Sequence, residues 1–186
     1  MYETFQPAFQ VARYFRFLDG LLRGRNAQAQ RACVSAKQGA TDNAACSRSQ
    51  PCRTFNAAVA AVTPGGEVVV LSSGGYAPVT ITKAVQIVAP AGVHASISQT
   101  SGNAVTVAAG VSDVVTLRGL TLNGSGGIGV NFDTGAALHV SNTVATDNVI
   151  GFGQNNGAVF ESYGNNRVRG NNASDTAGVI TPVGEI

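Results

Sequence analysis

Apolar and polar residues alternate in many short runs from Glu67 onward. Each run has three to five residues, and most runs are separated by Gly, Asn, Ser or Asp. The runs occupy residues 68–71, 79–81, 85–88, 104–107, 114–117, 120–122, 129–132 and 138–140. Helical spacing of apolar residues is missing, so the pattern predicts an all-β segment made of many very short strands.

Residue types also recur in this segment at an interval of 23 residues. The aligned sets are Leu117, Val140 and Tyr163; Leu122, Ala145 and Val168; Gly119, Asn142 and Asn165; Asn148 and Asn171; and Val107 and Val130. Such a repeat is typical of a solenoid, in which strands of successive coils stack in parallel and Asn residues form ladders along the axis. A β-sandwich is the competing fold, but neither Asn-Gly pair, at 123–124 or 156–157, lies between two alternating strands. We therefore predict a right-handed parallel β-helix of about four to five coils.

Residues 31–66 predict a cap on the N-terminal end of this β-helix. An extended stretch and a polar loop come first, and Thr54 is then a suitable N-cap for a short helix over 55–62, which Pro64-Gly65-Gly66 would end. We expect this helix to lie over the end of the β core and exclude water. The predicted domains are the cap at 31–66 and the parallel β-helix at 67–186.

Residues 1–30 form a leader segment of different composition, with six of the twelve aromatic residues of the chain. Residues 8–22 fit an amphipathic basic helix, and Ala27-Gln28-Ala29 has the form of a signal-peptidase site, but arginines interrupt the preceding stretch. A membrane-surface helix is one interpretation. The other, which we favour, is a leader whose upstream part is absent or misassigned, and the sequence leaves open whether it belongs to the mature protein. No segment is long and apolar enough to span a bilayer.

Charge is sparse, at 12% of residues, and the net charge of +2 comes from the leader. Residues 1–31 carry a balance of +3 and residues 32–186 a balance of −1. No basic stripe follows residue 31, and we therefore expect no nucleic-acid partner.

Three cysteines occur, at Cys33, Cys46 and Cys52. A disulfide between Cys46 and Cys52 would close a small loop and contribute about 2 kcal/mol by the chain-entropy model. The alternatives are two free thiols, or a metal site that takes its third thiolate from Cys33. We favour the disulfide if the protein is exported, and Cys33 is then most simply a small buried apolar residue.

Several segments together resemble a known family. They are CSRSQPCRTF at 46–55, followed by an Ala-rich helix, GGEVVVL at 65–71, GY at 75–76, VTITK at 79–83 and DVVTLRGL at 113–120. In this order they resemble the secreted right-handed β-helix repeat proteins of bacteria, within the pectin-lyase-like superfamily. The resemblance covers roughly residues 30–180. It implies the fold and a secreted, periplasmic or cell-surface location, and it assigns no activity.

Pectate lyases of that superfamily hold Ca²⁺ with clustered acidic residues and abstract a proton with a basic side chain. Between residues 67 and 180, where the coils are predicted, the acidic residues are Glu67, Asp113, Asp133, Asp147 and Glu161, with Asp175 near the end, and no two are 23 residues apart. This register stacks no carboxylates for a calcium ion or for glycoside hydrolysis. We transfer no catalytic residue and expect no cofactor, with Ca²⁺ required only if the protein is a lyase.

Four residues are candidates for contact with a glycan, namely Arg118, Arg167, Arg169 and Tyr76. Each also has a structural interpretation, which we favour. Arg118 is then a solvated residue, Arg167 and Arg169 protect a sheet edge from aggregation, and Tyr76 packs over a turn. His139 is expected to point outward as a lone histidine that binds no metal.

Three functions are compatible with these features. The first, which we favour, is a non-catalytic exported module that binds, or is displayed with, extracellular polysaccharide or the cell surface. The second is a polysaccharide lyase or glycoside hydrolase, argued by fold analogy alone. The third is a purely structural or adhesive fragment of a longer solenoid, or an ice-binding β-solenoid. Ice binding would require a flat face of regularly repeated threonines, and the threonines at 80, 106, 116 and 121 keep no single 23-residue register, so we do not favour it. The glycan and the oligomeric state stay open.

Overall fold

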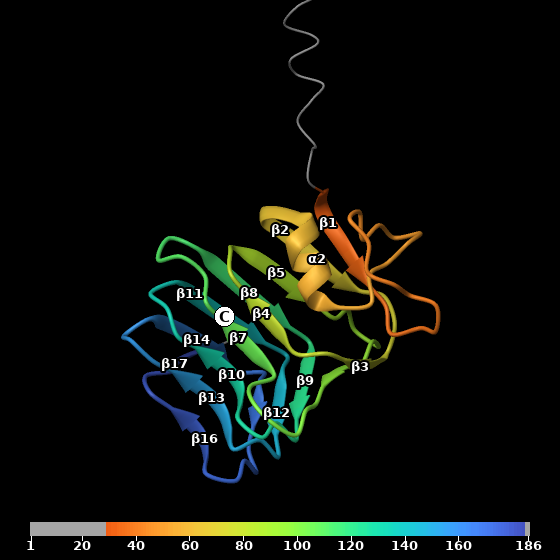
Figure 1. Ribbon diagram of the computed structural model, residues 1–186. Coiled ribbons are helices and arrows are strands. Elements are labelled where there is room, and N and C mark those ends of the chain that lie inside the picture. Colours follow the sequence, from red (N-terminus) through yellow and green to blue (C-terminus); the bar gives the residue numbers. More distant parts are fainter. Residues whose placement is uncertain (1–28, 185–186) are drawn as a thin grey trace, which may run out of the picture.

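Three parallel sheets form the sides of a solenoid of about five turns in the computed structural model, which describes residues 29–184 (Figure 1). The predicted all-β parallel solenoid is thus confirmed. From β2 onward the chain passes through the three sheets in the same order in each turn, so strands three apart in the sequence become neighbours, whereas β1 pairs directly with β2. The predicted leader helix lies outside the described residues.

The seven-stranded sheet, called sheet A here, contains β1 (Ala29–Val34), β2 (Val62–Val70), β5 (Val85–Val88), β8 (Val114–Arg118), β11 (Ala137–Ser141), β14 (Val159–Tyr163) and β17 (Thr181–Val183). Sheet B contains β3 (Gly74–Tyr76), β6 (Ala95–Ile97), β9 (Leu120–Asn123), β12 (Val144–Thr146) and β15 (Arg167–Val168). Sheet C contains β4 (Val79–Ile81), β7 (Val105–Val107), β10 (Ile128–Phe132), β13 (Ile150–Gln154) and β16 (Ser174–Ala177).

The interval between paired residues is 23 in only part of the solenoid. Leu122, Ala145 and Val168 pair as predicted along sheet B. Leu117 also pairs with Val140, but Val140 then pairs with Ser162, at an interval of 22. The prediction that Tyr163 continues this set is therefore wrong, because a turn that is one residue shorter moves it to the next position of the strand.

The predicted pairing of Val107 with Val130 is also wrong. Val130 pairs with Val105, and Val107 pairs with Phe132, both at an interval of 25. The turns between strands take up these differences in length while each strand keeps its alternation. In the strands Val105–Val107 and Val79–Ile81, for example, only the middle threonine faces away from the core.

Apolar side chains of every turn point into the solenoid and stack on those of the next turn. Leu117, Leu138 and Ile87 are fully buried on sheet A. Aromatic rings fill the later turns, where Phe160 lies 5.2 Å from Phe152 and 6.1 Å from Phe132 between ring centroids. The core is therefore one continuous apolar column along the axis.

The sharp corners between sheets use left-handed backbone at recurring positions. Between sheets A and B, Gly119 has φ +76° and Asn142, 23 residues on, has φ +48°. Between sheets B and C, left-handed residues occupy Gly124, Asp147 and Gly170 at the same interval. Gly, Asn and Asp adopt this conformation most readily, so the corner positions explain part of the sequence repeat.

An asparagine ladder joins two of these corners. The side chain of Asn148 accepts from Ser125 N–H at 3.0 Å and donates to Leu122 O at 3.0 Å. Asn171 repeats the arrangement one turn later, donating to Ala145 O at 3.1 Å and accepting from Asn148 Nδ2 at 3.0 Å. These bonds satisfy backbone groups at a corner where strand pairing stops.

The predicted ladder of Asn142 and Asn165 exists as one rung, since Asn165 Oδ1 accepts from Asn142 N–H at 2.9 Å.

One short helix, α2 (Phe55–Ala61), lies over the N-terminal end of the described solenoid (Figure 1). Thr54 is its N-cap, as predicted, and accepts from Ala57 N–H at 3.2 Å. The helix ends at Ala61, before the predicted glycine-rich stop, because β2 begins at Val62.

β2 also runs across the predicted boundary between cap and β-helix at residues 66 and 67, so the cap is continuous with sheet A. No helix among residues 29–184 is long and apolar enough to cross a membrane.

The corner at Gly119 generates a stability prediction. A Cβ atom there would lie 2.3 Å from Ala89 O, so Gly119→Ala should lower the free energy of unfolding by about 2 kcal/mol or more. Gly65→Ala is the matched control, because Gly65 has φ +81° but no atom within 4 Å of the added Cβ, and it should cost only about 1 kcal/mol. Urea unfolding measures both variants. Equal losses of unfolding free energy would contradict the importance of the contact with Ala89 O.

The asparagine ladder generates a second prediction. Asn148→Ala should lower the free energy of unfolding by about 2 kcal/mol, because the buried backbone groups of Ser125 and Leu122 lose their partner. Asn172→Ala, at an exposed position nearby, should change it by less than about 0.5 kcal/mol. Thermal and urea unfolding of the two variants test this. If Asn148→Ala leaves the free energy of unfolding unchanged, water replaces the ladder.

Candidate functional site

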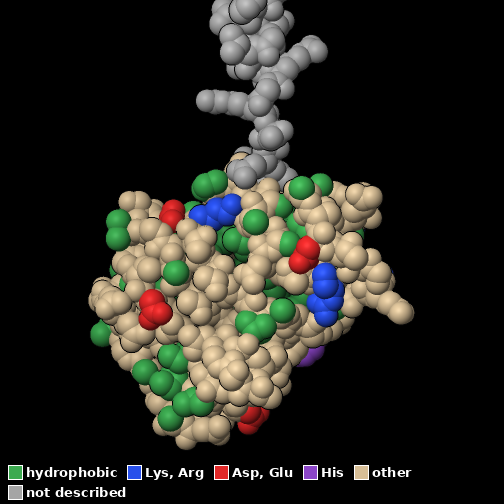
Figure 2. Space-filling view, in the orientation of Figure 1, with side chains coloured by type: hydrophobic (Ala, Val, Ile, Leu, Met, Phe, Trp, Pro, Cys, Tyr) green, Lys and Arg blue, Asp and Glu red, His purple; other side chains and the backbone are tan. Residues whose placement is uncertain are grey.

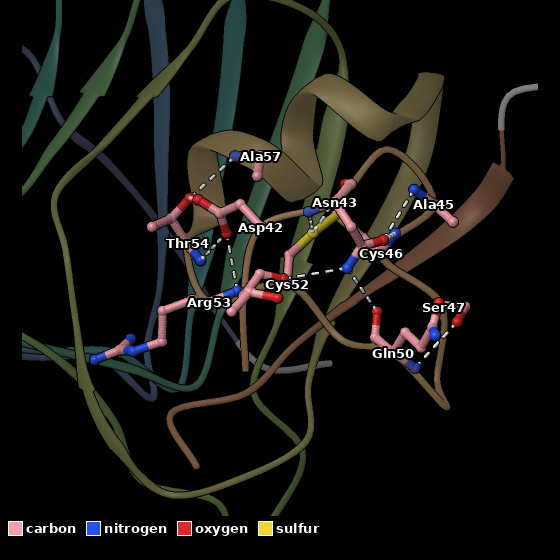
Figure 3. The surroundings of a disulfide bond; sticks show 11 residues. Asp42, Asn43, Ala45, Cys46, Ser47, Gln50, Cys52, Arg53, Thr54 and Ala57 are labelled. Atoms are coloured by element: carbon pink, nitrogen blue, oxygen red, sulfur yellow. Dashed lines mark hydrogen bonds between the residues drawn. A yellow bond between two sulfur atoms is a disulfide. The ribbon is translucent and has the colours of Figure 1, made fainter. Parts of the chain in front are cut away.

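The loop of the cap is held by a disulfide between Cys46 and Cys52, with 2.03 Å between the sulfur atoms (Figure 3). Asn43 fixes the loop from inside, because its Oδ1 accepts from Cys46 N–H at 2.8 Å and its Nδ2 donates to Gln50 O at 3.0 Å. Cys33 is a free, buried cysteine beneath it. Burial raises the pKa of the Cys33 thiol, and this outweighs the positive charges of nearby arginines.

Asp42 ties this loop to the start of α2 (Figure 3). Its carboxylate accepts from Arg53 N–H at 2.9 Å, from Thr54 N–H at 2.8 Å and from the Thr54 hydroxyl at 2.8 Å. Slight desolvation acts to raise the pKa of Asp42, but the hydrogen bonds from Thr54 and Arg53 and the charge of Arg53 outweigh it, so the pKa is lowered. The cap is therefore built as a structural unit around these contacts.

Charged side chains and histidines on the strands gather on sheet A. Its strands carry Arg31, Glu67, Arg118, His139 and Glu161, whereas the strands of sheets B and C carry only Arg167 and Asp175, both in the last described turn. Figure 2 looks onto the side of the molecule where Figure 1 shows the strands of sheet C, and charged side chains there are few and widely separated. The outer face of sheet A is therefore the chemically richest side of the solenoid.

One row of polar residues crosses the whole outer face of sheet A, and we call it the polar row. Strand pairing aligns its members in the order Arg31, Glu67, Gln86, Thr116, His139, Glu161 and Thr181. Neighbouring strands are about 4.8 Å apart, so the row presents donors and acceptors at a regular spacing. At one end Arg31 Nε donates to Glu67 Oε2 at 2.6 Å.

A short apolar row lies beside the polar row. Val114, Ala137 and Val159 pair across β8, β11 and β14, and the two valines are 48% and 53% exposed. They form a small apolar strip beside the polar groups of the same face.

His139, Glu161 and Tyr163 form a cluster on this face. His139 Nε2 lies 3.3 Å from Glu161 Oε2, and each side chain is 32% exposed. The Tyr163 ring lies edge-on to the imidazole, with 6.4 Å between ring centroids. An imidazole oriented by a carboxylate can exchange protons with a bound molecule, and a half-exposed tyrosine offers both an apolar ring and a hydroxyl.

The four sequence candidates do not form one site. Arg118 is exposed on the outer face of sheet A, beside Ser141 in the pairing of β8 with β11. Arg167 and Arg169 are exposed at the edge of sheet B in the last described turn.

Tyr76 is not available to a glycan, because it is only 4% exposed. Its ring packs 4.9 Å from that of Phe55, its hydroxyl donates to Ser72 O at 2.7 Å, and the Arg53 guanidinium lies over it. These contacts agree with the packing interpretation of Tyr76, and we do not include it in the candidate site.

The 23-residue repeat does not predict the contact between His139 and Glu161. These residues are 22 positions apart, and only the shorter turn between β11 and β14 brings them opposite each other. A search at intervals of 22 to 25, the range seen around β7 to β14, would have found the pair.

In residues 29–184, no three His, Cys, Asp or Glu side chains come together as a metal site would require. Comparison of the chain with protein-family models, with curated protein sequences and with solved structures gives no match. The fold and the chemistry of the outer face therefore carry the functional argument.

The lowered pKa of Asp42 generates a pH prediction. A carboxyl whose pKa is lower in the folded state stabilises it above the unfolded value of about 3.9, and this contribution is lost as pH falls through the folded pKa. Asp42→Asn should therefore destabilise the protein at neutral pH, by less than about 1 kcal/mol because the group is exposed to solvent.

The difference from the unchanged protein should shrink as the pH falls below about 4, as measured by urea unfolding across pH. Asp147→Asn is the control, since the Asp147 carboxylate accepts one long bond, from the Thr146 hydroxyl at 3.4 Å. A deficit of Asp42→Asn that persists unchanged at acid pH would show that its charge is not the cause.

Proposed function

We propose that this protein is an exported β-helix module that binds an extended carbohydrate polymer along the outer face of sheet A without transforming it. The polar row is the observation that carries the proposal, because it runs across all seven strands of the sheet. A ligand that follows this row is long and regular, and it offers hydrogen-bonding groups at each step.

The chemistry of the face suits a sugar chain. The polar row offers hydroxyl, amide, imidazole and carboxylate groups, which match the donors and acceptors of sugar hydroxyls. The apolar row and the Tyr163 ring offer surfaces for the C–H faces of sugar rings. The row carries few charges, and Arg31 at its end is already paired with Glu67, which favours a polymer of low charge over a strongly acidic one.

Export is part of the proposal and is supported by the cap. A disulfide in a short loop is typical of proteins that work outside the reducing cytosol. The segments between residues 46 and 120 that resemble secreted β-helix proteins of the pectin-lyase-like superfamily point to the same location.

A lyase or hydrolase acting on polysaccharide is the second candidate, and one observation favours it. His139 and Glu161 form a half-exposed base and carboxylate on the same face. A histidine oriented in this way can remove a proton from a bound substrate, as the first step of an elimination requires. Within residues 29–184, no second charged side chain forms a salt bridge with His139 or Glu161.

A binding experiment tests the proposal. On a glycan array and in affinity electrophoresis, the protein should retain a subset of neutral or weakly charged polysaccharides. Replacing Tyr163 by Ala and His139 by Ala should each weaken binding by about tenfold, because each removes a central contact. Thr106→Ala, on the outer face of sheet C, is the matched control and should leave affinity unchanged.

The same samples separate the two candidate activities. A lyase would generate an unsaturated sugar product that absorbs in the ultraviolet, and a hydrolase would generate new reducing ends. Retention without either product supports the binding module, and product formation that is lost in Glu161→Gln supports the enzyme. Absence of binding to every polysaccharide tested would refute the proposed function.

A further inference from the structure

Two corners of the solenoid contain an Asn-Gly dipeptide, at Asn123-Gly124 and at Asn156-Gly157. This dipeptide is chemically labile in water, because the backbone nitrogen of the unhindered glycine can attack the side-chain amide of the asparagine before it. The rate in a folded protein depends on whether the local structure leaves both groups free to meet. The solenoid holds its two Asn-Gly pairs in different ways.

The pair Asn123-Gly124 is held within the stack of strands. Asn123 ends β9, pairs with Thr146 of β12, and accepts with its Oδ1 from the Ser96 hydroxyl of β6 at 3.0 Å. The Gly124 N–H donates to Thr146 O at 3.3 Å. Neither the asparagine side chain nor the glycine nitrogen can move without breaking a contact to a neighbouring turn, so this pair is protected.

The pair Asn156-Gly157 lies at the tip of the turn between β13 and β14, where both residues are exposed. Asn156 has φ +62° and Gly157 has φ +69°, and a turn with two successive left-handed residues favours Asn-Gly. The backbone thus favours the labile dipeptide at this turn. A Cβ added at Gly157 would have no atom within 4 Å, and the Gly157 N–H makes no backbone hydrogen bond within residues 29–184. The attacking nitrogen is therefore unshielded.

One side-chain hydrogen bond fixes the Asn156 amide. Its Nδ2, which is the leaving group of the reaction, donates to Asp133 O at 2.8 Å. Once this bond opens, rotation of the Asn156 backbone and side chain brings its Cγ to the Gly157 nitrogen. Opening costs little, because the turn is exposed and water replaces the lost partner.

We propose that Asn156 is a site of spontaneous covalent modification, at which it is converted into aspartate and isoaspartate. The Gly157 nitrogen loses its proton and bonds to Asn156 Cγ, while the Cγ–Nδ2 bond breaks and ammonia leaves, which forms a cyclic imide. Water then opens the imide. Opening at Cγ gives aspartate, and opening at the backbone carbonyl carbon gives isoaspartate, in which the main chain runs through the former side chain. Overall, water is consumed and ammonia is released.

The modification changes the turn in two ways. The new carboxylate cannot donate to Asp133 O, and it adds a negative charge near Asp133, whose own carboxylate accepts from Asn155 Nδ2 at 2.7 Å. Isoaspartate also lengthens the main chain of the segment that leads directly into β14. Glu161 lies on that strand, opposite His139. Modification of Asn156 therefore loosens the start of β14 and weakens the contact of Glu161 with His139, whatever the face of sheet A binds.

Peptide mapping by mass spectrometry, after storage of the full chain at mildly alkaline pH, tests the site. In the folded protein, Asn156 should gain the mass of amide-to-acid conversion about tenfold or more faster than Asn123, with isoaspartate among the products. In the reduced chain unfolded in urea, both pairs should react at similar rates, because the structural difference is gone. Equal rates in the folded protein, or an Asn156 that reacts only after unfolding, would overturn the inference.

Asn156→Gln is the matched variant for the storage experiment. It keeps an amide at the turn, but attack on the longer side chain forms the cyclic imide far more slowly. Position 156 should therefore keep its mass in this variant, while Asn123 converts at the slow rate seen in the unchanged protein. Acid formation at position 156 of the variant at the original rate would show that Gly157 is not the attacking group.

The NMR signals of the histidine rings report the effect on sheet A. The chain has two histidines, so His94, in the turn before β6, is an internal control for His139. Conversion of Asn156 should shift the imidazole signals of His139 and leave those of His94 unchanged. Stored Asn156→Gln should show neither change. A His139 signal that stays the same in fully converted protein would contradict the link between this turn and Glu161.

Discussion

The structure depends on one constraint, which is that each turn of the chain must stack its strands in register on the turn before. Backbone hydrogen bonds between turns and burial of inward side chains act together, because a strand that pairs correctly also adds its Val, Leu, Ile or Phe to the column. Turns of different length are tolerated as long as they return the chain to the same three sides. Left-handed corners such as Gly119 and Asn142 make that return possible within few residues.

This constraint also determines what the outer surface can do. Outward residues of successive turns necessarily form rows, so each patch of the surface combines side chains from strands that are distant in the sequence. On sheet A this places Thr116, His139 and Glu161 side by side, although they come from three turns. A repeated row is suited to a repeated ligand, and this is the physical basis for proposing a polymer as the binding partner.

A stacked fold must also deal with its two ends. Here the disulfide loop, Arg53 and Asn56 satisfy the strand edges at one end and make it a finished surface. The other described end presents edges, apolar side chains and charges of both signs. Within residues 29–184, the chain itself therefore satisfies the strand edges of the capped end, whereas β15, β16 and β17 each pair on one side only.

The sequence by itself determined the class of fold and much of the cap, because alternation, corner residues and the Thr54 N-cap are local properties that depend on neighbours in the chain. It also pointed to Cys46 and Cys52 as partners, since they close a short loop. It could not determine which outward residues meet, because a turn shorter by one residue moves every following side chain in the row, as it did for Tyr163 and Glu161. The tertiary structure decided the pairing of His139 with Glu161, the burial of Tyr76 and the contrast between the two ends, since each depends on contacts between turns and not on any single segment.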